Sequence, residues 1–157
     1  MDATRHRLLG IYLNDHLAGS MAGVGRARMT RDANQGTEFA APLAAVCGGI
    51  EEDRATLESI VDDLGIGRSK IKPLLGRLGE IIGRAKPNGQ LRGYSPLSRV
   101  VDLESLVLGI SGKRRLWILL GELLDGETAV DTATLIRRAE DQLATVEDLQ
   151  VRAARLL

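Results

Sequence analysis

Apolar residues recur along most of this chain at the spacing that places them on one face of an α-helix. The longest such pattern covers residues 37–64, and a helix of that length would extend about 40 Å. Steps of four and three residues separate its seam positions, which are Val46, Ile50, Asp53, Leu57, Ile60 and Leu64. A seam of this kind is typical of a helix that packs lengthwise against others in a bundle.

Four more segments show helical spacing, and residues that favour helix ends mark their starts. The segments are 4–24, 73–84, 95–124 and 128–157. Pro73 and Pro96 suit a first helical turn, and Ser95 is a typical cap residue. Thr128 and Asp131 have the spacing of a capping box. We therefore expect about four long helices with short ones between them.

Glycine and short polar residues indicate where these helices break. Residues 26–36, with Asp32, Asn34 and Gly36, predict a loop, and Gly65 with Gly67 ends the long helix. We expect a further interruption near residues 111–112, a serine followed by a glycine. Gly19 and Gly23, four residues apart, would let a neighbouring backbone approach the far end of the first helix closely.

The composition favours the same fold class. Of the 157 residues, 44% are hydrophobic and only 3% are aromatic. Leucine, alanine, arginine and glutamate are good helix formers, whereas strands favour β-branched and aromatic residues. We predict one all-α domain over residues 1–157, an antiparallel bundle of about four long helices plus short connecting helices.

Charge, cysteine content and hydropathy limit where the protein acts. The 21 basic and 21 acidic side chains cancel, so no global field attracts nucleic acid or anionic lipid. Cys47 is the single cysteine, which excludes an intramolecular disulfide and points to a buried, inert thiol in a reducing compartment. We find no signal peptide and no membrane-spanning run, so we expect a cytoplasmic protein.

Three polar residues occupy seam positions of the predicted helices. They are His16, Asp53 and Glu104. Burial of an ionisable group is costly unless the group is paired or binds a metal. These residues could meet at mid-height of a bundle, and we expect Asp53 to have partners on other helices, His16 or Tyr12 by seam position.

Helices that direct carboxylates and a histidine toward a shared centre resemble the ferritin-like bundles. Residues 12–18 (YLNDHLA), 50–54 (IEEDR) and 94–99 (YSPLSR) also resemble an uncharacterised bacterial helical family of similar length and no known activity. The ferritin-like resemblance implies a metal-binding or oxidative-stress function. Its implied metal ligands would be His16, Glu52, Asp53 and Glu104.

The ligand pattern of that family is nevertheless missing. Di-metal bundles of this type take a Glu-x-x-His motif from two of their helices. Three residues after Glu51, Glu52, Asp53 and Glu104 come Arg54, Ala55, Thr56 and Val107. We therefore expect no di-iron centre and predict no cofactor. A polar cluster that fixes helix register, or a single bound metal ion, is the alternative.

A basic stretch follows an acidic one in the middle of the chain. Residues 68–99 carry an excess of seven positive charges, whereas residues 51–63 carry six acidic side chains against Arg54. The two stretches could neutralise each other, or the basic one could bind an acidic partner. The candidate partner-binding residues are Arg68, Lys70, Lys72, Arg77 and Arg84.

The same region imitates a helix-turn-helix over residues 57–78. Pro73 would fall inside its recognition helix, where proline removes a hydrogen bond and clashes with the preceding turn. We therefore do not expect nucleic-acid binding.

Trp117 is expected in the core, with an oligomer contact as the alternative. No nucleophile or nucleotide-binding motif is present. We predict a non-enzymatic module for self-association or binding to a protein partner, without membrane contact. A ferritin-like metal-binding or oxidative-stress protein is the first alternative, and a DNA-binding protein through residues 57–78 is the second.

Overall fold

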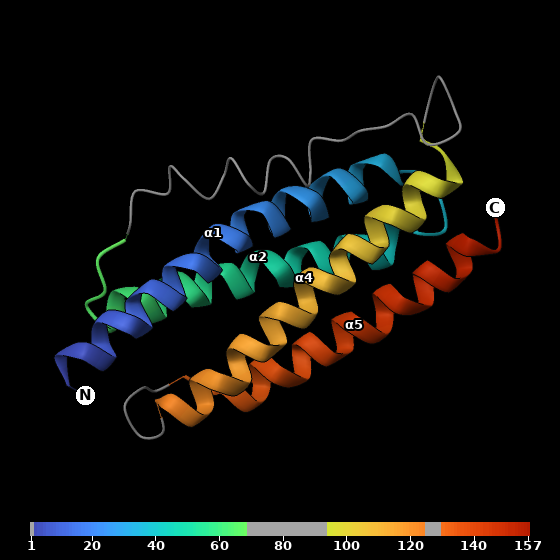
Figure 1. Ribbon diagram of the computed structural model, residues 1–157. Helices are drawn as coiled ribbons and strands as arrows, with labels where there is room; N and C mark the ends of the chain where they lie inside the picture. The colour runs from blue at the N-terminus through green and yellow to red at the C-terminus, as the bar shows by residue number, and fades with distance from the viewer. Residues whose placement is uncertain (1, 69–93, 125–129) are drawn as a thin grey trace.

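The computed structural model describes residues 2–68, 94–124 and 130–157, and in these ranges every regular element is a helix (Figure 1). The helices are α1 (Ala3–Ala33), α2 (Ala40–Asp63), α4 (Pro96–Leu123) and α5 (Thr132–Ala154). The predicted all-α bundle is confirmed. The predicted short helix over residues 73–84 lies outside the described residues.

The helices form a ring in which α1 contacts α2 and α4, and α5 contacts α2 and α4. Each of these pairs is antiparallel. At one end Arg5 of α1 donates to the carbonyl of Leu123 in α4 (2.9 Å), and at the other Arg26 pairs with Asp102 (2.7 Å). The chain leaves α2 and enters α4 at opposite ends of the bundle (Figure 1). One long connection of this kind is a known four-helix-bundle connectivity, and ferritin-like folds use it.

The core lies on the inward faces of all four helices. Its largest fully buried side chains include Trp117, Phe39, Leu13, Leu43, Ile60 and Leu103. Of the helices in the described residues, none has both the length and the apolar character needed to cross a membrane.

Side chains that accept backbone hydrogen bonds begin three of the helices. Asp2 accepts from the amide of Arg5 (2.8 Å), and Ser95 accepts from that of Ser98 (3.0 Å). The Ser95–Pro96 helix start is therefore confirmed. For α5 the predicted cap at Thr128 was wrong by three residues, because Asp131 itself caps the helix through the amide of Thr134 (3.0 Å). Thr128 lies outside the described residues.

Gly65 ends α2, as predicted, with a positive φ of 63°. The amide of Gly65 donates to the carbonyl of Asp62 (2.9 Å), and that of Ile66 donates to Val61 (3.0 Å). This is the Schellman pattern, which satisfies carbonyls that the helix end leaves open. Ile66 is buried, and its side chain approaches Gly10 of α1.

Two predicted breaks are wrong, because tertiary contacts outweigh local helix-breaking signals. Helix α1 continues to Ala33 through most of the predicted 26–36 loop, and Ala27 and Thr30 on this extension are fully buried. Helix α4 continues through residues 111–112 without interruption. Its inward face is buried on both sides of this point, at Ile110 and Leu116.

Within the described residues, no close approach is seen at Gly19 and Gly23. A β-carbon built at either glycine would have no atom of residues 2–68, 94–124 and 130–157 within 4 Å. The close approach on α1 is instead at Gly10, where a β-carbon would lie 3.3 Å from Ile66 Cγ2. Gly10 therefore leaves room for Ile66, which lies in the segment directly after α2.

Candidate functional site

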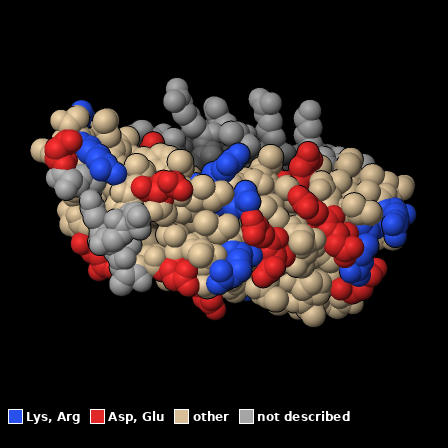
Figure 2. All heavy atoms as spheres, turned by 90° about the horizontal axis from the view of Figure 1, so that it is seen from below, with Lys and Arg blue, Asp and Glu red and all other residues tan. Residues whose placement is uncertain are grey.

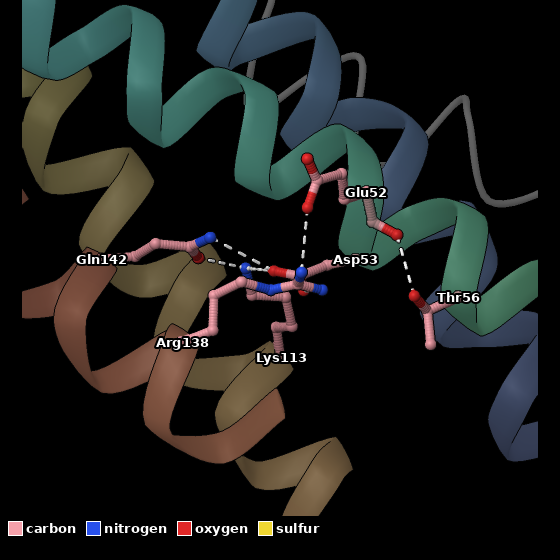
Figure 3. Close-up of polar contacts among 6 residues, drawn as sticks. All are labelled: Glu52, Asp53, Thr56, Lys113, Arg138 and Gln142. Atoms are coloured by element: carbon pink, nitrogen blue, oxygen red, sulfur yellow. Dashed lines mark hydrogen bonds and ion pairs between the residues drawn. The ribbon is translucent and has the colours of Figure 1, made fainter. Parts of the chain in front are cut away.

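A buried carboxylate, Asp53, is the centre of a polar cluster between α2, α4 and α5 (Figure 3). Lys113 of α4 and Arg138 of α5 form ion pairs with its two carboxylate oxygens. Gln142 donates to Asp53 (3.3 Å) and accepts from Lys113. Arg138 also reaches Glu52, one residue before Asp53 (3.0 Å). One buried anion therefore links three helices, and we call these residues the Asp53 cluster.

The electrostatics of the Asp53 cluster suit a structural role. Burial lowers the pKa of Lys113, although the Asp53 carboxylate opposes this shift. The buried Nε of Arg138 has no hydrogen-bond partner among the described residues, while the other nitrogens of Arg138 bind Asp53 and Glu52. Because each charge contacts an opposite charge, the cluster offsets much of the cost of burial.

The four residues considered as metal ligands do not come together. Asp53 is buried and Glu52 is exposed beside it, but Glu104 lies on the exposed face of α4. His16 stacks edge-on against Tyr12 with ring centroids 4.6 Å apart, and burial lowers its pKa. Within the described ranges, no three His, Cys, Asp or Glu residues form a group that could hold a metal ion.

The expected burial of Asp53 is confirmed, but the expected partners are wrong. Neither His16 nor Tyr12 bonds to it. Its partners are Lys113, Arg138 and Gln142. Sequence reasoning missed these three because a lysine, an arginine and a glutamine at helical positions are ordinarily solvated. The sequence held one sign of a buried polar partner: Gln142 lies on the apolar seam of α5, between Ala139 and Val146.

The side chain of Gln142, in the Asp53 cluster, leaves no room for a side chain at Gly49. A β-carbon at Gly49 would lie 2.5 Å from Gln142 Nε2, whereas at the adjacent Gly48 it would meet no atom of the described residues within 4 Å. We expect Gly48→Ala to stabilise the protein by about 0.5–1 kcal/mol, since alanine favours helix. Gly49→Ala should destabilise it by about 1–2 kcal/mol despite the same gain, because Gln142 must move.

Urea unfolding of both glycine variants measures this difference. In a Gln142→Ala background the Gly49→Ala substitution should become neutral or stabilising. Equal effects of the two glycine substitutions in the native background would contradict a tight fit at Gly49.

A second polar network lies at the end of the bundle where α1 ends and α4 begins. Asn34, fully buried after α1, accepts from Arg99 Nε of α4 (2.6 Å). Tyr94 donates to Asp102 (3.0 Å), which also pairs with Arg26. Burial, followed by the Asp102 charge, raises the pKa of Tyr94. This network joins the α1–α2 connection to the start of α4.

The predicted partner-binding residues are only partly described. Arg68 pairs with Asp62 (2.6 Å), which is one contact between the basic and acidic stretches. Lys70, Lys72, Arg77 and Arg84 lie outside the described residues, as does the second helix of the helix-turn-helix prediction. On the face in Figure 2, basic and acidic side chains are interspersed.

Cys47 and Trp117 both lie in the core, each 1% exposed, as predicted. Burial is the main cause that raises the pKa of the Cys47 thiol, and the nearby Glu51 adds to it. A raised thiol pKa disfavours the reactive thiolate.

Two surface hollows lie at the start of α1, away from the Asp53 cluster. In the first, His6 bonds to the carbonyl of Leu64 (3.0 Å), and Asn14 bonds to those of Gly10 and Gly67. The second has an apolar floor that includes Leu9, Tyr12 and Leu123. The polar groups of the first hollow thus hold the chain after α2 against α1.

The exposed face of α4 carries a line of large apolar side chains. Leu97, Val101, Leu108 and Leu119 are 41%, 41%, 69% and 45% exposed. Their spacing of four, seven and eleven residues places them on one side of the helix. Glu104, Gly112 and Arg115 occupy the positions between them and are also exposed. We call these seven residues the α4 stripe.

The chain gives no match to protein-family models, to curated proteins or to solved structures. The ferritin-like and bacterial-family resemblances therefore stay predictions.

Proposed function

We propose that this protein is a non-enzymatic helical module that associates with protein, itself included, through the α4 stripe. The observation that supports this is the exposure of four large apolar side chains on one helix face, with Leu108 69% exposed at its centre. Exposed large apolar side chains that share one face with polar residues between them are typical of a protein interaction surface. Three leucines and a valine that share one side of a helix at spacings of four, seven and eleven residues are suited to packing against another helix.

The Asp53 cluster supports the same function indirectly. Its side chains are engaged with one another, and it joins α2, α4 and α5 through charged contacts. Such a cluster fixes the register of α4 in the bundle. A fixed α4 presents its outward face in one geometry, which lowers the entropy cost of association.

The two alternative functions have weaker support. A metal-dependent role needs ligands around Asp53, whose oxygens contact Lys113 and Arg138. A DNA-binding role depends on residues 69–78, which lie outside the described part of the chain. A cytoplasmic location is our prediction from the single cysteine and the hydropathy pattern.

Sedimentation equilibrium over a range of protein concentrations tests this function. We expect the native protein to form a concentration-dependent oligomer and Leu108→Glu to be monomeric, because a carboxylate at the contact loses hydration without gaining a partner. Monomeric native protein at every concentration would contradict self-association.

The matched control is Met21→Glu. Met21 is 36% exposed and lies seven residues before Arg28, whose side chain pairs with Glu51 of α2. Met21 therefore lies on the side of α1 turned toward α2, away from the α4 stripe. The Met21→Glu variant should therefore oligomerise like the native protein.

A further inference from the structure

The α4 stripe has a spacing that reads the same in both directions. From Leu97 to Leu119 the steps are four, three, four, four, three and four residues, so Leu108 is the midpoint. Leu97 and Leu119 lie eleven residues on either side of it. A surface of this kind can pack against a second copy of itself about a two-fold axis, which is the commonest symmetry of soluble oligomers.

The charges of the α4 stripe distinguish between the two ways of pairing it. In a parallel arrangement Glu104 would face Glu104 of the partner subunit, and Arg115 would face Arg115 of the partner subunit. Like charges directly opposite each other are unfavourable. In an antiparallel arrangement centred on Leu108, Glu104 comes within three residues of the partner subunit's Arg115, about 4.5 Å along the axis.

Glu104 and Arg115 are available for such a contact. Both are exposed, and neither forms an ion pair or a side-chain hydrogen bond within residues 2–68, 94–124 and 130–157. Gly112 would lie opposite the partner subunit's Glu104. A β-carbon at Gly112 would meet no atom of the described residues within 4 Å, so packing within this part of the chain does not explain a glycine inside the helix.

We propose that the partner of the α4 stripe is a second copy of this chain, packed antiparallel about a two-fold axis at Leu108. Two symmetric Glu104–Arg115 ion pairs between the subunits favour the antiparallel orientation of the two α4 helices. Leu97 packs against Leu119 of the partner subunit. This rests on the proposed function, since it assigns the partner of the same surface. The contact would extend about 33 Å along α4, which suits a weak, concentration-dependent dimer.

Charge reversal in solution tests this geometry. Glu104→Arg and Arg115→Glu each place like charges at both inter-subunit pairs of a homodimer, so each should weaken dimerisation about tenfold. An equimolar mixture of the two variants should form heterodimers with about native affinity, because both pairs are then opposite in charge. Circular dichroism of each variant checks that the helices are intact.

The outcomes separate the two proposals. Weak homodimers of each variant together with a native-like heterodimer would support the antiparallel pairing. A native dimer that neither substitution affects would overturn the pairing and leave the α4 stripe as an interaction surface. A native protein that stays monomeric would overturn both.

Discussion

Asp53→Ala should lower the free energy of unfolding by about 3 kcal/mol, because removing one partner from a buried ion pair leaves the other charge uncompensated. Here Lys113 loses its counter-charge, and Arg138 keeps only its pairing with the exposed Glu52. The Lys113 and Arg138 side chains are 15% and 30% exposed, so partial hydration keeps the loss at the lower end of the usual range. Urea unfolding at neutral pH measures it.

The control for Asp53→Ala is Glu58→Ala on the same helix. Glu58 pairs with Arg54 one turn away, and both side chains are 31% exposed, so its loss should cost about 0.5 kcal/mol or less. Similar losses in the two variants would show that Asp53 contributes no more than a surface carboxylate.

The pH dependence of Asp53→Ala gives a second readout. Burial already lowers the pKa of Lys113 below its ordinary 10.5, and loss of the opposing Asp53 charge should lower it further. Between the lowered pKa and 10.5, the unfolded chain binds the proton more tightly than the folded one, so stability rises with pH. The stability difference from the native protein should therefore narrow as the pH is raised toward 10.5. A constant difference would contradict a charged Lys113 as the cause.

Phe39→Ala should destabilise the protein by about 3–5 kcal/mol, the usual cost of removing a buried aromatic ring. Phe39 is the single phenylalanine and is 1% exposed at the start of α2. The guanidinium groups of Arg99 and Arg152 lie 4.6 and 5.4 Å from its ring centroid. The ring thus connects α2 to α4 and α5 as well as filling the core.

Phe39→Leu separates the ring's charge contacts from its volume. We expect it to cost about 1–2 kcal/mol, because leucine fills much of the space but cannot attract the two cations. A double-mutant cycle of Phe39→Leu with Arg152→Ala, followed by thermal unfolding, should give a coupling of about 0.5–1 kcal/mol. No coupling would show that the ring acts through its volume alone.

The burial of Asp53 could be predicted because its position on the α2 seam follows from helical periodicity alone. The identity of its partners could not. Lys113 and Arg138 have long stems that carry the charged group several ångströms from the backbone, so their contacts depend on how the helices are placed. Lys113 also precedes Arg114 and Arg115, a run that indicates a solvated surface.

The exposed face of α4 shows a second limit of periodicity. Apolar residues cover more than one side of this helix, and such a pattern does not reveal which side is buried. The structure places Leu103, Leu106 and Ile110 in the core and leaves Leu108 outside. The α4 stripe could therefore be recognised only once the neighbours of α4 were known.

Cross-linking at position 108 tests the two-fold contact most directly. Only at the axis does a residue meet its own copy, so Leu108→Cys in a Cys47→Ala background should yield a covalent dimer with a short bis-maleimide. Met21→Cys in the same background should give far less dimer. Equal, background-level cross-linking at both positions would contradict a dimer centred on Leu108.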